Sequence, residues 1–260
     1  TDMKRSIFYI FVGLILALML LPSCQEKKHK GGRTDTPTSG VMPFASDESF
    51  SPIIEEEREM FEDMYPDAKL KPIYTNEYDE VDMLMRGKIC LAITSRDFTP
   101  RQLKYLQDND FQPTSIKLAY DGLALIVNKN NNDTCISVKD VKRILSGEVT
   151  EWNQIYPGSK WGKIKIVCDN PKSSTVKFCE DSILGGHGIS SVNASAVKTS
   201  QGVIDFVEKT PNAIGVIGSN WLNDKRDTTN CTFKKNIHVM SVSKMDKATE
   251  MNSWKPYQAY

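Results

Sequence analysis

Apolar positions along the chain follow two periods, one typical of helices and one typical of strands. Between residues 51 and 65 apolar residues recur every three or four positions after Pro52, which predicts a helix capped by Ser49 or Ser51. Shorter apolar runs between turn residues predict strands. We expect helices over residues 51–65, 77–86, 100–109, 137–146, 176–184 and 200–209. We expect strands over residues 70–75, 88–94, 116–128, 163–168, 213–218 and 236–242.

Strands and helices alternate in this order over most of the chain. A strand, a helix and a second strand in succession favour parallel pairing and an α/β fold. The long apolar stretch over residues 116–128 is interrupted near its middle, which indicates a strand that bends or crosses between lobes. Because a second set of strand and helix units follows it, the pattern predicts two α/β lobes.

The first 40 residues differ from the rest of the chain. Two basic residues precede an apolar run over residues 7–21, which is shorter than a full membrane span and predicts a signal peptide over residues 1–23. Residues 20–24 resemble the lipobox of bacterial lipoproteins, which implies lipidation of Cys24. Residues 24–40 contain few large apolar side chains and predict a flexible tether. We therefore expect an exported protein, lipid-anchored to a bacterial membrane on the periplasmic or cell-surface side.

Charge argues against nucleic acid as a partner. The 260 residues include 33 basic and 33 acidic ones, and residues 41–260 keep 27 basic and 30 acidic residues. A folded body with a net charge of −3 does not attract a polyanion over long range, so a bound anion needs a local set of donors.

The residues that usually carry catalysis or metal binding are sparse. Five cysteines besides Cys24 form no CxxC pair, so we expect neither a structural zinc nor another metal, and we expect buried thiols at Cys90 and Cys168. The chain has three histidines, His29, His187 and His238. His29 lies in the tether, and GxSxG, HExxH and P-loop motifs are absent from the sequence. We expect a protein that is not an enzyme and that needs no cofactor.

Three loops bring together hydroxyl groups and charge where strands end or helices begin. Free backbone N–H groups and Ser or Thr hydroxyls at such places suit an anion, and a guanidinium adds charge-assisted hydrogen bonds. The candidates to bind an anion are Ser49, Phe50, Ser95, Arg96, Ser173, Ser174 and Thr175. The candidates to accept a ligand proton are Asp47, Asp97 and Asp169. The alternative interpretation is that the serines only cap helices and that Arg96 forms a surface ion pair.

Six segments in this order resemble the PstS-like phosphate-binding proteins of ABC transporters, a branch of the type II periplasmic solute-binding proteins. They cover residues 48–52, 92–97, 118–128, 144–152, 169–175 and 213–218. The resemblance implies a two-lobed α/β fold in which a ligand cleft lies between the lobes and two hinge strands lie near residues 118–128 and 213–218. It places residues 41–118 and 219–260 in lobe I and residues 119–218 in lobe II.

The same resemblance implies that the protein captures inorganic phosphate for an ABC permease and ATPase, as a monomer. It assigns Ser49 and the backbone N–H of Phe50 to the first lobe, and the three hydroxyls over residues 173–175 to the second. Many family members have Asp where this chain has Arg96, and better-known members place an arginine just before the second-lobe loop. We hypothesise that Arg96 supplies this charge from the opposite lobe, with Lys172 as a helper.

The sequence leaves the ligand and the cellular role partly open. Phosphate carries a proton near neutral pH, so an acceptor carboxylate would favour it over fully ionised sulfate. Sulfate, molybdate, tungstate and a phosphorylated organic solute remain as alternatives. A sensor or adhesion lipoprotein on the same fold is a further alternative.

Overall fold

The computed structural model of the chain describes residues 35–222 and 236–256. The chain divides into two units, Thr1–Pro37 and Thr38–Tyr260, and the fold described below belongs to the second. Its strands are β1 (Gly40–Asp47), β2 (Ala68–Thr75), β3 (Ala92–Ile93), β4 (Leu123–Asn128), β5 (Cys135–Ser137), β6 (Lys165–Cys168), β7 (Ala194–Ala196), β8 (Ala213–Gly218), β9 (Ile237–Val239) and β10 (Ser241–Ser243). Its α-helices are α2 (Ser51–Met64), α3 (Glu77–Met85), α4 (Pro100–Asp108), α5 (Val138–Leu145), α6 (Ser174–Phe178) and α7 (Ser200–Lys209).

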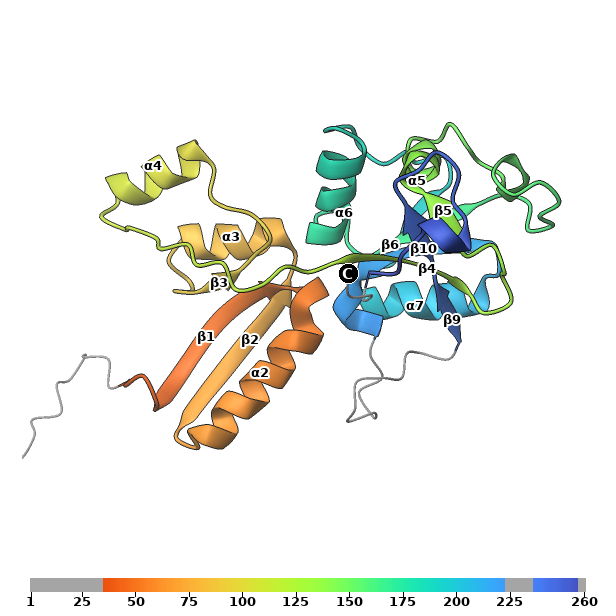
Figure 1. Cartoon of the computed structure of the whole chain (residues 1–260). Coiled ribbons are helices and arrows are strands. Elements are labelled where there is room, and N and C mark those ends of the chain that lie inside the picture. The colour runs from red at the N-terminus through yellow and green to blue at the C-terminus, as the bar shows by residue number, and fades with distance from the viewer. Residues whose placement is uncertain (1–34, 223–235, 257–260) are drawn as a thin grey trace, which may run out of the picture. The chain divides into compact units, whose positions relative to one another are not determined.

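A small parallel sheet of order β2-β1-β3 is formed by the N-terminal part of this unit. Helices α2 and α3 connect its strands in sequence, as expected for βαβ units (Figure 1). The core beside it is small and centres on Ala45, Leu84 and Ile89. Strand β1 ends at the fully buried Asp47, so the sheet delivers this carboxylate to the loop that follows.

A larger mixed sheet of order β7-β6-β8-β4-β9 has an apolar layer on each face. Successive residues of β4 point to opposite faces: Leu125 packs with one buried cluster and Ile126 with the other. Helix α7 covers the second cluster, whereas α5 and α6 cover the first (Figure 1). Gly215 of β8 permits this packing, because a Cβ there would lie 2.7 Å from Val203 Cγ1 and 2.8 Å from Val207 Cγ2.

The C-terminal strands join this larger sheet system and not the small one. Strand β9 pairs with β4, and β10 pairs with β5 in a separate two-stranded parallel sheet. Within residues 219–260, which we assigned to lobe I, the strands over 237–243 therefore pair with elements that we assigned to lobe II. The remaining lobe and hinge boundaries stay predictions.

Two strands are shorter in the structure than the sequence predicts. Of residues 88–94 only 92–93 pair with β1, and Cys90 is exposed, so the expected burial of its thiol is wrong, whereas Cys168 is buried as expected. Of residues 116–128 only β4 forms. Ile116 and Leu118, on the segment that precedes β4, are each 74% exposed. Their β-branched or aliphatic side chains suit a strand, but the segment pairs with no strand among the described residues.

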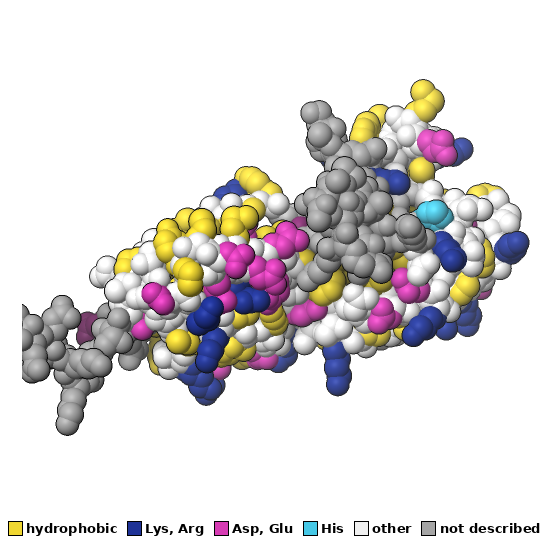
Figure 2. Space-filling model, turned by 90° about the horizontal axis from the view of Figure 1, so that it is seen from below, with side chains coloured by type: hydrophobic (Ala, Val, Ile, Leu, Met, Phe, Trp, Pro, Cys, Tyr) yellow, Lys and Arg dark blue, Asp and Glu magenta, His cyan; other side chains and the backbone are white. Residues whose placement is uncertain are grey.

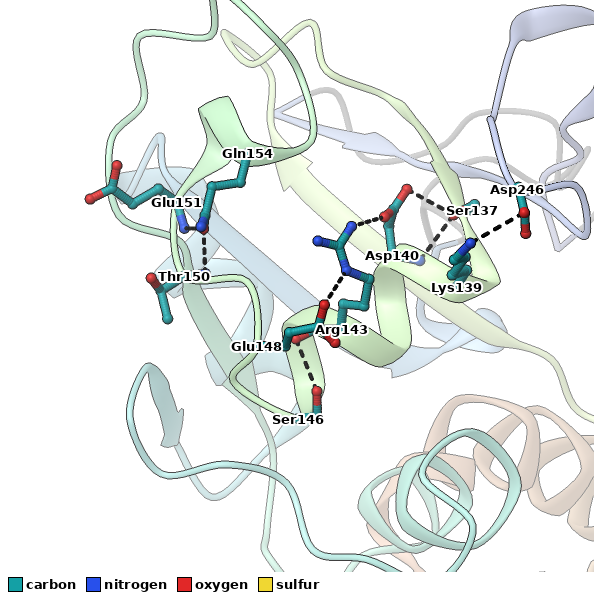
Figure 3. Close-up of polar contacts among 10 residues, drawn as sticks. All are labelled: Ser137, Lys139, Asp140, Arg143, Ser146, Glu148, Thr150, Glu151, Gln154 and Asp246. Atoms are coloured by element: carbon teal, nitrogen blue, oxygen red, sulfur yellow. Dashed lines mark hydrogen bonds and ion pairs between the residues drawn. The ribbon is translucent and has the colours of Figure 1, made fainter.

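Helix α5 and the turn after it are held by local polar contacts (Figure 3). Ser137 caps the helix by accepting the Asp140 N–H at 2.9 Å. Arg143 donates to Asp140 Oδ1 at 3.0 Å and to Glu148 Oε1 at 2.8 Å. These contacts fix the segment over residues 144–152, one of the six that carry the family resemblance.

Basic and acidic side chains of the described residues are interspersed on the face shown in Figure 2, in line with the balanced composition. Within residues 35–222 and 236–256, the helices are too short or too polar to cross a membrane. The same residues contain no cluster of His, Cys, Asp and Glu that could hold a metal ion. Cys24 and the predicted signal peptide lie outside the described residues.

Candidate functional site

The first candidate loop, the Asp47 loop (residues 47–50), turns from β1 into α2 through a short 3₁₀ turn. Asp47 Oδ1 accepts the Ser49 N–H at 2.9 Å and thereby caps the turn. Helix α2 follows with Phe50 at its N-cap position and without a side-chain cap, so the prediction that Ser49 or Ser51 caps it is wrong. The Ser49 hydroxyl, fully buried, is consequently available for a contact outside its own helix.

The second candidate loop, the Asp169 loop (residues 169–175), leads from β6 into α6. Asp169 Oδ1 accepts hydrogen bonds from the Ser173 hydroxyl at 2.6 Å and the Thr175 hydroxyl at 2.7 Å. Ser173 also caps α6 by accepting the Val176 N–H at 3.3 Å. All three predicted hydroxyl residues of this loop are buried, and two of them are ordered by one carboxylate.

The structure brings these two loops together. The Ser49 and Ser174 Oγ atoms lie 2.8 Å apart and share a hydrogen bond, and the Ser174 N–H donates to Asp47 Oδ2 at 3.0 Å. The Trp221 indole N–H, in the 3₁₀ turn Ser219–Leu222 that follows β8, donates to the Ser49 carbonyl at 2.9 Å. Residues that the sequence predicts from separate loops, Ser49 and 173–175, therefore form one buried polar cluster.

Glu48 makes a further contact between elements distant in sequence. Its Oε2 accepts the Ser200 N–H at 3.1 Å and the Ser200 hydroxyl at 2.9 Å, at the start of α7. A carboxylate is favoured there by the unpaired N–H groups and the positive end of the helix dipole. Burial nevertheless raises the pKa of Glu48, while the Ser200 hydrogen bonds oppose the rise. Sequence reasoning missed this role, because the glutamate shows no signal beyond its place in the Asp47 loop.

The third candidate loop, the Arg96 loop (residues 95–97), faces α3 instead of the Ser49–Ser174 pair. Arg96 Nε donates to Glu77 Oε1 at 2.9 Å, and the Ser95 hydroxyl donates to Glu77 Oε2. Arg96 Nη1 donates to the Gln102 Oε1 at 3.2 Å. Asp97 is exposed, so among the three candidate proton acceptors only Asp47 and Asp169 are buried in the cluster.

The alternative of an ordinary surface ion pair at Arg96 does not fit its partner. The Glu77 side chain is only 5% exposed, whereas that of Arg96 is 30% exposed. A buried carboxylate needs its counter-ion and hydrogen bonds, so the pair holds the Arg96 loop against α3. Lys172, the predicted helper, lies in the Asp169 loop, and its Nζ is 4.7 Å from the centroid of the Tyr78 ring of α3. Glu77 was missed, since an acidic residue in a first helical turn is common.

Carboxyl groups dominate the electrostatics of the site. Glu80 of α3 is fully buried, and its two oxygens have no hydrogen-bond partner among the described residues. Burial, and secondarily the nearby Asp47, raise the pKa of Glu80 to about 9. Burial also raises the pKa of Asp169 to about 6, although the Ser173 and Thr175 hydroxyls oppose this rise. Glu80 is therefore neutral at pH 7, and Asp169 is in a range where it can exchange a proton.

The donors of the three loops are thus engaged by carboxylates of the chain itself. Asp47 takes the N–H groups of Ser49 and Ser174, Asp169 takes two hydroxyls, and Glu77 takes the Ser95 hydroxyl and the Arg96 guanidinium. An arrangement of converging amides and hydroxyls can bind an oxyanion, provided that the anion replaces some of these carboxylates or shares a proton with them.

Comparison with known proteins assigns the fold. Residues 31–258 match the model of the PBP superfamily domain. The chain belongs to the PBP superfamily. The chain is 24% identical over 241 residues to the phosphate-binding protein PstS of Staphylococcus aureus. The aligned residues cover 92% of this chain and 72% of that relative. The predicted PstS-like resemblance is confirmed by this match.

Solved structures agree with the superfamily fold. A substrate-binding protein of Clostridium perfringens, assigned to a phosphate ABC transporter and solved with bound phosphate, matches with a TM-score of 0.65 at 21% identity, over 80% of this chain and 78% of that chain. An ABC-type phosphate transport receptor from Vibrio cholerae matches with a TM-score of 0.55 at 18% identity, over 82% and 80%. The predicted α/β fold of periplasmic binding proteins is therefore confirmed. These PBP-superfamily relatives are named for binding and transport, in line with the expectation that the chain is not an enzyme.

Proposed function

We propose that this chain is an extracytoplasmic solute-binding protein that captures inorganic phosphate for an ABC importer. The observation that carries the proposal is the hydrogen bond between the Ser49 and Ser174 hydroxyls, 2.8 Å apart across 125 residues of sequence. Backbone amides and hydroxyls that converge from two loops are suited to replacing the water around a small oxyanion. The names of the Staphylococcus aureus and Clostridium perfringens relatives support phosphate as that oxyanion.

The proposed ligand set keeps the residues named from the sequence. Ser49, the Phe50 N–H and the hydroxyls of residues 173–175 would bind phosphate oxygens from the two loops that meet. Arg96 would add charge through its Nη2, which donates no hydrogen bond among the described residues while Nε and Nη1 are engaged. Ser95 would act through Glu77, by keeping that carboxylate turned towards the Arg96 loop.

Asp169 is the acceptor that we propose for the proton of phosphate. Its Oδ1 already accepts two hydroxyls, whereas its Oδ2 has no hydrogen-bond partner among the described residues. Asp47 uses both oxygens for backbone amides, and Asp97 is exposed. A carboxylate acceptor repels sulfate, which has no proton to share, and thereby selects phosphate and arsenate.

The cellular setting belongs to the same proposal. A solute-binding protein of an ABC importer works outside the cytoplasm and delivers its ligand to a permease with an attached ATPase. The predicted signal peptide and the lipidation of Cys24 would place this chain on the outer side of a bacterial membrane. Metabolic labelling with a radioactive fatty acid, with a Cys24→Ala variant as control, tests the anchor.

Thermal unfolding with a panel of anions tests the binding function. Phosphate at a thousandfold excess over Kd is expected to stabilise the protein by about 4 kcal/mol. Phosphate and arsenate should raise the unfolding temperature, whereas sulfate and molybdate should leave it unchanged. A Ser174→Ala variant should lose most of the response, and Ser115→Ala, an exposed serine outside the three loops, should keep it. An equal response to all four anions would contradict a site that selects phosphate.

A further inference from the structure

Asp47 has the contacts of a bound anion. Its carboxylate is fully buried, and both of its oxygens accept backbone amides, one from Ser49 at 2.9 Å and one from Ser174 at 3.0 Å. These amides belong to the two loops that would enclose an oxyanion in the proposed function. The carboxylate thus fills, from within the chain, hydrogen bonds that a ligand would otherwise fill.

We propose that Asp47 is an internal ligand, which keeps the Asp169 loop closed on the Asp47 loop without any bound solute and which phosphate must displace. The identity of the displacing anion rests on the proposed function, whereas the closure by Asp47 does not. Asp47 is then a residue that sets the affinity of the site, because every binding event includes the release of its contact to Ser174.

Glu48 strengthens the same closure through a separate element. It accepts both the backbone N–H and the hydroxyl of Ser200 at the start of α7. Asp47 and Glu48 are adjacent in one loop, so movement of this loop releases two anchors together. The neighbouring hydrogen bond from Trp221 to the Ser49 carbonyl is neutral and adds a third anchor that does not depend on charge.

Phosphate and the Asp47 carboxylate exclude each other at these amides. The Ser174 N–H has one hydrogen, and two anions at hydrogen-bond distance from it would repel each other strongly in a buried site. The apparent affinity for phosphate is therefore the intrinsic affinity multiplied by the fraction of molecules in which Asp47 has released the Ser174 N–H. If Asp47 instead accepted the proton of phosphate, its removal would weaken binding, so the two roles predict opposite signs.

The test combines phosphate affinity with the size of the ligand-free protein. Asp47→Asn keeps one carbonyl oxygen for the Ser49 N–H and removes the charge that competes with phosphate. Isothermal titration of phosphate should show about tenfold tighter binding to Asp47→Asn, as expected if about nine-tenths of the wild-type molecules are closed on Asp47. The matched control is Asp63→Asn, an exposed aspartate of α2, which should bind like the wild type.

Small-angle scattering of the phosphate-free chain provides the second readout. The double variant Asp47→Asn/Glu48→Gln should have a larger radius of gyration than the wild type, and phosphate should reduce it to the wild-type value. Unchanged or weaker phosphate binding by Asp47→Asn, or a radius of gyration that the double variant leaves unchanged, would overturn the proposal. If neither the wild type nor any variant binds phosphate, the proposed function fails, and the scattering of the phosphate-free proteins still decides whether Asp47 and Glu48 close the loops.

Discussion

Asp47 and Ser174 are separated by 127 residues of sequence, and the Asp47 carboxylate accepts the Ser174 backbone N–H at 3.0 Å. The contact links the end of strand β1 to the start of helix α6. Beside it the Ser49 and Ser174 hydroxyls share a hydrogen bond. The Asp47 loop and the Asp169 loop meet at this junction, whereas the Arg96 loop faces α3.

Loss of the Ser174 hydroxyl should weaken phosphate binding. A hydrogen bond to a charged group contributes about 1.5–3 kcal/mol, so Ser174→Ala should raise the Kd for phosphate about 10- to 100-fold. Isothermal titration of Ser174→Ala against the Ser115→Ala control measures the effect. Equal affinities in the two variants would remove the Ser174 hydroxyl from the ligand set.

Protonation of Asp169 should reduce phosphate affinity at acid pH. Burial raises the pKa of Asp169 to about 6, so below that pH the group loses its capacity to accept a proton from the ligand. The affinity of the wild type relative to Asp169→Asn should fall about fivefold from pH 6 to pH 5, since the ionised fraction of Asp169 falls from about a half to about a tenth. The ratio of the two affinities at each pH cancels the effect of the titration of phosphate itself, which is the same for both proteins. A ratio independent of pH would assign the proton acceptor elsewhere.

Glu80 should make the protein less stable as pH rises. The pKa of Glu80 is raised to about 9 in the folded state against 4.5 for an ordinary glutamate, so the folded state holds one proton more than the unfolded state between these values. The free energy of unfolding should therefore fall with pH, by at most about 1.4 kcal/mol per pH unit from this group. Urea unfolding from pH 5.5 to 8 should show a flatter dependence for Glu80→Gln.

The matched control for that experiment is Glu56→Gln, because Glu56 is exposed on α2. This variant should keep the wild-type dependence of unfolding free energy on pH. If Glu80→Gln keeps it as well, Glu80 is ionised in the folded protein and its isolation from hydrogen-bond partners does not hold in solution.

Arg96 and Glu77 should be coupled in stability. Removing Arg96 alone leaves the buried Glu77 carboxylate without its counter-ion, which costs about 3–5 kcal/mol for a fully buried pair and less here because Arg96 is partly exposed. Arg96→Ala should thus be less stable than Arg96→Ala/Glu77→Gln in urea unfolding. A double-mutant cycle that shows additive effects would contradict the ion pair.

Gly215 should tolerate no side chain. A Cβ at this position would lie under 3.0 Å from Val203, Ile126 and Val207, which are core side chains between β8, β4 and α7. Overpacking of this kind costs about 1–3 kcal/mol, so Gly215→Ala should lower the free energy of unfolding by that amount. Gly188→Ala is the control, because its nearest atom would be at 3.6 Å, and it should be close to neutral.

Local patterns predicted the helices well and the strands less well. Helices α3, α4 and α7 lie within one residue of their expected bounds, because caps and turn residues mark their ends. Strand β1 was not predicted, and it contains Pro43, a residue that is rare in the interior of a sheet. The structure accommodates it because β3 pairs only with Ala45 and Ser46, beyond the proline.

The site was predictable where its residues cluster in sequence. The hydroxyls of the Asp47 and Asp169 loops were identified, because small polar residues before a helix indicate exposed amide donors. The acidic residues Glu48, Glu77 and Glu80 were not identified, since their contacts and burial depend on packing between distant segments. The engagement of Arg96 with Glu77 of α3 was not predicted either, because it follows from the packing of the Arg96 loop against this helix.

A crystal structure of the chain grown with inorganic phosphate would show whether the two loops that meet at Ser49 and Ser174 bind the anion. We expect phosphate between the Asp47 loop and the Asp169 loop, within hydrogen-bond distance of Ser49, Ser174 and Thr175. The Asp47 carboxylate should be displaced from the Ser174 N–H. Phosphate bound elsewhere, or a Ser174 N–H that still donates to Asp47 while phosphate is bound to the protein, would contradict this expectation.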